Sequence, residues 1–148
     1  MRALRLTAAQ LAQLAALGEA AWPREACALL VGHDGGEHLQ VVEVVPARNI
    51  AASPAREFEL DPAVHIAVLR RLRETNETNL RILGHWHSHP NGRAEPSAQD
   101  AAMIYDGSLV WLISAVQDGR SQATTAWQPK DAADGFAPLP LTLQERET

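Results

Sequence analysis

One segment of the chain combines residue types that could perform chemistry, GHWHSHPNGRAEPSAQD at positions 84–100. His87 and His89 alternate along it, so in extended backbone both side chains point to the same side. Asp100 follows eleven residues later, across a loop bounded by prolines. Two imidazoles and one carboxylate can hold Zn²⁺ and leave a fourth position open, which is typical of catalytic zinc sites. The spacing predicts a metal site built from His87, His89 and Asp100.

Two neighbouring residues have more than one interpretation. His85 continues the alternation of histidines, but it is also explained as a packed or surface histidine, and its role stays open. Ser97 and Asp100 have the S-x-x-D spacing of a helix N-cap, which is the simpler interpretation of that pair alone. With His87 and His89 just upstream, the metal interpretation is favoured for Asp100, and the two interpretations are compatible.

A metal-dependent hydrolase also needs a general base close to the attacking water, usually a glutamate that is not itself a ligand. Glu25 is distinctive because it directly precedes the apolar run ACALLVG. A carboxylate at the edge of a buried strand is partly desolvated, which raises its proton affinity. On this local argument alone a solvated surface glutamate is the simpler interpretation. Cys27, inside the run, is expected to be a small buried hydrophobe and not a nucleophile.

These residues resemble the JAMM motif of the MPN-plus metallopeptidases. The string HSHP, followed after six residues by SAQD, is similar to the family pattern H-[ST]-H-P-x6-S-x-x-D. Upstream, PREACALLVG is similar to the family segment that carries the catalytic glutamate, and Glu25 occupies that position. Asn49 and the FELDP segment at positions 58–62 also look similar. Ala28 departs from the usual glycine, and His85 departs from the usual apolar or aromatic residue.

The resemblance implies an activity and a set of roles. His87, His89 and Asp100 would hold one Zn²⁺ per chain, Glu25 would act as general base, and Ser97 would donate a hydrogen bond to the oxyanion. The likeness is greatest to compact bacterial stand-alone members, some of which cleave after the C-terminal diglycine of ubiquitin-like or sulfur-carrier proteins. The implied function is hydrolysis of a peptide or isopeptide bond in such a partner. The alternative is a non-catalytic MPN-type module that binds a ubiquitin-like protein.

Composition excludes several other classes of protein. The chain has 148 residues and a formal net charge of −5, and an acidic balance argues against nucleic-acid binding. No apolar run is long enough to span a membrane, and the N-terminal segment is amphipathic, unlike a signal peptide. One cysteine cannot form an internal disulfide. We therefore expect a cytoplasmic protein, with its oligomeric state open.

The elements that must position these residues follow from hydrophobic periodicity and turn residues. Thr7 and Gln10 have capping-box spacing, and Asp61 is placed to cap a second helix. The expected helices are residues 7–21, 62–75 and 97–105, and the expected strands are residues 26–32, 39–45, 81–87, 109–116, 121–127 and 139–143, with a short strand at Phe58 and Leu60. The expected irregular segments are the loops 46–57 and 89–96, a loose stretch at 128–138 and a frayed C-terminal tail.

Strands and helices mingle in this sequence without strict alternation. That order favours a mixed β-sheet with helices packed around it, an α+β (mixed α/β) fold. The length suits one domain of ordinary size. We expect residues 1–148 to form a single domain, with 128–148 as a partly loose C-terminal segment.

Overall fold

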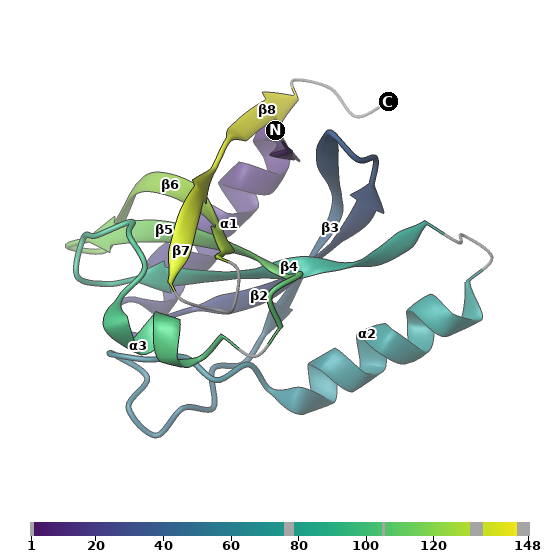
Figure 1. Ribbon diagram of the computed structural model, residues 1–148. Helices are drawn as coiled ribbons and strands as arrows, with labels where there is room; N and C mark the ends of the chain where they lie inside the picture. Colours follow the sequence, from purple (N-terminus) through teal and green to yellow (C-terminus); the bar gives the residue numbers. More distant parts are fainter. Residues whose placement is uncertain (1, 76–78, 105, 131–134, 145–148) are drawn as a thin grey trace.

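The computed structural model describes residues 2–75, 79–104, 106–130 and 135–144 (Figure 1). Within these ranges the chain forms three helices and eight strands. Their order is β1 Ala3–Thr7, α1 Ala8–Ala21, β2 Cys27–Asp34, β3 His38–Ala47, α2 Pro62–Glu74, β4 Leu80–His89, α3 Ala98–Ala102, β5 Val110–Gln117, β6 Arg120–Pro129, β7 Phe136–Leu139 and β8 Leu141–Gln144. No helix in the described ranges has the length and apolar character needed to cross a membrane.

All eight strands belong to one mixed sheet, in the order β7-β6-β5-β4-β2-β3-β1-β8. The pairs β4–β5, β1–β3 and β1–β8 are parallel, and the other pairs are antiparallel. β7 and β8 stand at opposite ends of this order although only Pro140 separates them in the sequence. The sheet therefore curls, and Figure 1 shows the two yellow strands following one another. The predicted mixed sheet is confirmed.

α1 packs on one face of this sheet. Thr7 caps the helix by accepting from the Gln10 backbone N–H at 3.0 Å, and the Gln10 side chain accepts from the Thr7 N–H at 2.9 Å, which confirms the predicted capping box. Gly18 faces the sheet so closely that a Cβ there would lie 3.1 Å from Val116. The core on this face is apolar and includes Leu4, Leu6, Leu14, Leu30, Val41, Leu83, Trp86 and Leu112.

The opposite face of the sheet carries α2 and α3. Asp61 caps α2 as predicted, since its side chain accepts from the Ala63 N–H at 3.0 Å. Val68 of α2 is 4% exposed and packs with Leu29 and Val31 of β2. A second small cluster on this side is formed by Cys27, Phe58 and Trp111. The residues that could perform chemistry lie on this face.

The structure corrects several predicted elements. β1 was not predicted, because five residues adjoining a helix cap carry little periodicity and their partners β3 and β8 are distant in sequence. The predicted strand at Phe58 and Leu60 is wrong, since only an isolated bridge between Asn49 and Leu60 forms there. β7 begins within the stretch 128–138 that was predicted to be loose and ends at Leu139, the first residue of the predicted last strand. Its Pro138 is tolerated because β7 pairs with β6 alone.

Element boundaries differ as well, and two of these differences concern the segments that carry the histidines and Asp100. β4 extends two residues beyond the predicted strand and ends at His89. α3 ends at Ala102, whereas the helix was predicted to reach Tyr105, which lies outside the described residues. Of the C-terminal tail, residues 145–148 also lie outside the described ranges.

Candidate metal centre

The C-terminal half of β4 presents alternate residues to the two faces of the sheet. Trp86 and Ser88 face α1, and His85, His87 and His89 face the side of α2 and α3, as the period of two requires. The three histidines are buried, with exposed fractions of 8%, 0% and 4%. β4 is a central strand, paired through His87 with Cys27 of β2 and Ile113 of β5. The predicted metal-binding histidines therefore stand on rigid backbone.

α3 brings Asp100 to the same place. Ser97 caps this helix, accepting from the Asp100 N–H at 3.0 Å, and the Asp100 carboxylate accepts from the Ser97 N–H at 2.8 Å. The helix-cap interpretation of the S-x-x-D spacing is thus confirmed. Asp100 is only 5% exposed. The cap fixes the backbone at Ser97 and turns the Asp100 carboxylate toward the histidines.

Two imidazoles and a carboxylate converge at one point. The Nε2 atoms of His87 and His89 are 2.9 Å apart. Asp100 Oδ1 lies 3.3 Å from the Nε2 of His87, and Oδ2 lies 3.0 Å from that of His89. Hence the structure brings together the three residues that the sequence analysis assigned to a metal.

The hydrogen bond at Nδ1 of His89 determines whether its Nε2 carries a hydrogen or a lone pair. Its Nδ1 lies 3.0 Å from the carbonyl oxygen of Arg93, which can only accept, so Nδ1 carries the hydrogen. In the neutral ring Nε2 then presents a lone pair toward Asp100, itself an acceptor. The Nε2 of His87 can carry one hydrogen, which is too few for the three close contacts among His87, His89 and Asp100. A cation site requires lone pairs that converge on one point and a hydrogen bond that orients a ligand from its other side. These residues have both features and therefore fit a metal ion.

The electrostatics of the cluster reflect the same crowding. Burial raises the pKa of Asp100, but its close contacts with the His87 and His89 rings outweigh burial and hold that pKa well below its usual range. Burial lowers the pKa of His89, yet its contact with Asp100 leaves the pKa above the ordinary value. The pKa of His87 is lowered, chiefly by burial. The opposite directions of these shifts follow from the close approach of the two imidazoles and the carboxylate.

Glu25 lies beside this cluster, just before β2. Its carboxylate and the ring nitrogens of His87 and His89 offer ligand atoms that all lie within 4.8 Å of one another. Burial raises the pKa of Glu25 to about 7, and its Oε1 is buried with no hydrogen-bond partner among the residues that the structure describes. Asn49 fixes the backbone here, donating from Nδ2 to the carbonyl oxygen of Glu25 at 2.9 Å. The predicted desolvation of this carboxylate is confirmed.

Aromatic rings hold His87 in place on the other side. Phe58 stacks on the His87 ring, with centroids 4.3 Å apart and planes at 19°. Trp111 meets it edge-on at 5.7 Å. The Nδ1 of His87 is buried without a partner among the described residues, so packing replaces the usual outer hydrogen bond. Sequence analysis placed Phe58 in the FELDP segment and in a short strand, but nothing local shows that it reaches β4.

An open cleft of about 360 Å³ adjoins the cluster. The predicted base Glu25, the predicted oxyanion donor Ser97 and His89 all line it, and the Ser97 side chain is exposed to it. Its other lining residues are Trp22, Pro23, Ala55, Arg56, Pro90 and Asn91. A chain entering this cleft would meet all three groups.

Cys27 lies next to His87 but takes no part in this arrangement. Its thiol is 2% exposed and contacts the carbonyl oxygens of Ala47 and Arg48 at 3.6 and 3.7 Å. Burial raises its pKa to about 12, so the thiol stays protonated at neutral pH. The expectation of a small buried hydrophobe is confirmed.

The fold and the cluster define a class of protein. Residues 7–129 match the family of prokaryotic homologues of the JAB domain, and the chain belongs to this family. A solved protein of Desulfitobacterium hafniense is 30% identical, superposes with a TM-score of 0.82, and is matched over 97% of this chain and 94% of its own. A JAB1/MPN domain protein of Archaeoglobus fulgidus shares the fold with a TM-score of 0.57 at 15% identity, over 96% and 99% of the two chains.

Curated relatives match over shorter stretches. A desampylase of Haloferax volcanii is 32% identical over 101 residues, 68% of either chain. A probable TtuB-protein conjugate cleaving protease of Thermus thermophilus is 33% identical over 78 residues, 53% of this chain and 47% of the relative. The alignment with the Thermus protein thus spans about half of its length.

Proposed function

We propose that this protein is a zinc-dependent peptidase or isopeptidase that cleaves conjugates of a ubiquitin-like or sulfur-carrier protein. The observation that carries the proposal is the convergence of His87, His89 and Asp100 beside a desolvated glutamate, at the edge of an open cleft. A purely structural cluster has no use for a buried carboxylate oxygen like that of Glu25, which has no partner among the described residues.

In this proposal Asp100, and not Glu25, completes the ligand set. Each carboxylate oxygen of Asp100 lies within 3.3 Å of one Nε2 atom. Glu25 belongs to the same group of ligand atoms by distance alone, but no hydrogen bond joins it to either histidine ring. Two nitrogens and one oxygen accept several divalent metals. Zinc is proposed through the family resemblance, at one ion per chain.

A zinc ion held there would polarise the scissile carbonyl and lower the pKa of water toward about 7. The protein's own groups do the rest. Glu25 accepts the proton of the attacking water and delivers it to the leaving amine, a role suited to a carboxylate whose burial favours the protonated form. The Ser97 hydroxyl already accepts from the Asp100 N–H, so its own hydrogen is free to stabilise the developing oxyanion.

The substrate class is supported by the relatives. The matched proteins are a desampylase and a probable protease of TtuB conjugates. Access also supports it, because the cleft is open and bordered by exposed Trp22 and Arg56, which a flexible diglycine tail could pass. We further propose that residues 1–148 act as one domain.

The direct test is hydrolysis of a ubiquitin-like or sulfur-carrier protein extended beyond its C-terminal diglycine. We expect cleavage after the second glycine, loss of cleavage after treatment with a chelator, and recovery when zinc is restored, followed by mass spectrometry of the products. Tight binding of such partners with no cleavage, in zinc-loaded protein, would instead establish the non-catalytic binding module.

A further inference from the structure

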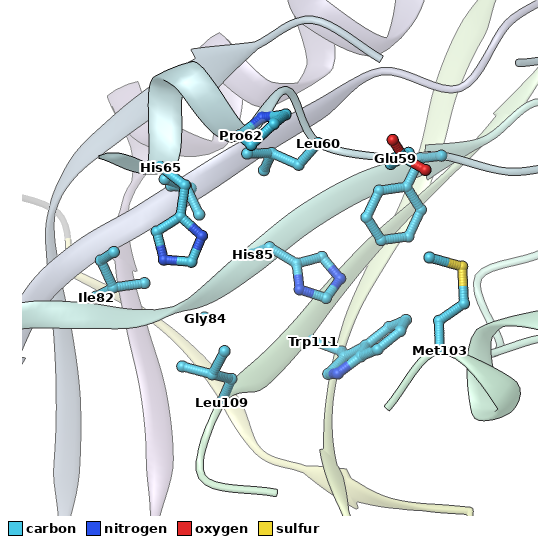
Figure 2. Close-up of a pocket in the computed structure, with 12 residues that line it drawn as sticks. Glu59, Leu60, Pro62, His65, Ile82, Gly84, His85, Met103, Leu109 and Trp111 are labelled. Carbon is cyan, nitrogen blue, oxygen red and sulfur yellow. The ribbon is translucent and has the colours of Figure 1, made fainter. Parts of the chain in front are cut away.

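A second cavity lies on the same face of the sheet, away from the open cleft. It has a volume of about 190 Å³ and is bounded by β4, β5, the chain before α2 and the end of α3 (Figure 2). Apolar side chains form most of its wall, namely Leu29, Phe58, Leu60, Ile82, Met103, Leu109 and Trp111. His65 stands on α2, and Glu59 is exposed. Figure 2 shows the rings of His65 and His85 among the lining side chains.

This cavity is distinct from the candidate metal centre. Its lining contains neither Glu25, His87 nor Asp100. Phe58 and Trp111 lie between the two, since both line the cavity and both contact the His87 ring. A ligand in the cavity would therefore touch the side chains that hold His87 without reaching the proposed zinc ligands.

His85 is the buried polar residue in the lining of the cavity, whereas Glu59 is exposed and His65 is partly exposed. Its ring is 8% exposed and is held between aromatic neighbours, at 4.9 Å from Phe58 and 4.3 Å from Trp111 between ring centroids. Its Nε2 is buried with no hydrogen-bond partner in the described part of the chain. A buried polar group left unpaired destabilises a fold, so such a group calls for an explanation. The mechanism proposed above does not use it.

The size and chemistry of the cavity define what it would hold. A dry apolar cavity of about 150 Å³ is known to admit benzene, so the larger cavity here accommodates an aromatic ring with one substituent. A charged substituent would lose its hydration against apolar walls. A hydroxyl both donates and accepts a hydrogen bond, so it matches the His85 ring in either tautomer.

We propose that this cavity binds a phenolic group, with the aromatic ring between Phe58, Met103 and Trp111 and the hydroxyl hydrogen bonded to the His85 imidazole. The group could belong to a free phenol or to a tyrosine side chain presented by a bound protein. The chemistry of recognition is the same for both.

Met103 provides the probe for a direct test. The sequence has two methionines, and Met103 lines the cavity, so its ¹³C-labelled methyl signal, assigned with Met103→Leu, reports a ring bound there. We would titrate the wild-type protein with phenol and, separately, with benzene. We expect both to shift the signal, with phenol binding roughly three- to tenfold more tightly, the preference that one hydrogen bond supplies.

Variants assign that preference to His85. We expect His85→Phe to remove the advantage of phenol over benzene, and His85→Leu repeats the test if the larger ring disturbs packing. The matched control is His38→Phe, because the Nδ1 of His38 is also buried with no partner in the described part of the chain but lies outside the cavity. This control should keep the wild-type preference.

Two further arms complete the experiment. N-acetyltyrosinamide binding in the same site would identify a tyrosine side chain as an acceptable occupant, whereas binding of free phenol alone would restrict the site to small molecules. The titrations are repeated in EDTA, where binding should persist, so failure of the zinc proposal leaves this test intact. No shift with either ligand, equal or tighter binding of benzene, or an unchanged preference in both His85 variants would overturn the proposal.

Discussion

The two faces of β4 differ in how many of their buried polar groups are hydrogen bonded. Toward α1, Trp86 donates from Nε1 to Ser114 Oγ at 2.9 Å, and Ser88 Oγ accepts from the Ala26 N–H at 2.8 Å. Toward α2 and α3, His85, His87 and the neighbouring Glu25 each have a buried polar atom with no hydrogen-bond partner within the described ranges. All of these residues lie in, or directly next to, the neighbouring strands β2, β4 and β5.

The difference separates stability from function. A satisfied hydrogen bond in a packed core contributes to folding, whereas an unpaired buried group costs free energy and persists when it has another use. The α1 face is therefore expected to determine how stable the protein is, and the opposite face to determine what it binds and cleaves. Substitutions on the two faces test this division.

The largest effect is expected on the functional face. Glu25→Gln keeps the size of the side chain and removes its ability to take a proton, so we expect cleavage to fall by roughly 10²–10⁴-fold while zinc content stays unchanged. The measurement is kcat on a diglycine-extended substrate beside zinc analysis. Glu37→Gln, at an exposed turn, is the matched control with normal turnover. Normal turnover in Glu25→Gln would refute the assignment of the base.

Trp86→Ala tests the opposite face. Trp86 is fully buried, so we expect the free energy of unfolding to fall by about 3–5 kcal/mol, measured by urea denaturation. Ile66→Ala, at a residue of α2 that is 52% exposed, should cost about 0.5 kcal/mol or less. A loss below about 1 kcal/mol for Trp86→Ala would show that the α1 face is not the stabilising one.

Ser97 caps α3 and is also the proposed oxyanion donor, and two variants separate these roles. Glycine is tolerated at an N-cap at a cost of a few tenths of a kcal/mol. Ser97→Gly should therefore leave stability almost unchanged while lowering kcat by roughly 10²-fold or more through the lost oxyanion donor. Ser97→Thr keeps the hydroxyl and should retain most activity. Equal kcat in wild type and Ser97→Gly would limit Ser97 to capping.

The smallest effect on stability is expected at Asp34, which lies outside both faces of β4 discussed above. The Gly36 backbone N–H, with Arg81 and Arg2, lowers the pKa of Asp34 from 3.8 to about 2. Because the folded-state pKa is the lower one, this stabilisation is present above about pH 4 and is lost as pH falls toward 2. Asp34 is largely solvated, so the contribution should stay below about 1 kcal/mol. The stability of Asp34→Asn, measured by unfolding between pH 2 and pH 4, should lack this loss. Identical pH profiles of stability for wild type and variant would contradict the assignment.

The sequence predicted local features well and distant contacts poorly. The caps at Thr7, Asp61 and Ser97 depend on residues three or fewer positions away, so their signatures are complete in the sequence. Alternation along β4 likewise placed its histidines on one face. β1 was missed because parallel pairing with β3 and β8 leaves no local signal.

At the candidate site, too, some features could be predicted from the sequence and others could not. The convergence of His87, His89 and Asp100 was predicted from spacing, and Glu25 was singled out through family resemblance. The stacking of Phe58 on His87, the support of Glu25 by Asn49 and the cavity at His85 were not predicted. Each of these depends on segments that are brought together only when the sheet forms.

The central claim is most directly tested by elemental analysis of the purified protein beside the His87→Ala/His89→Ala double variant. The account predicts about one zinc per chain in the wild type and none in the variant, with both proteins folded by circular dichroism. A wild-type protein that takes up no zinc at neutral pH, even when zinc is supplied, would contradict it.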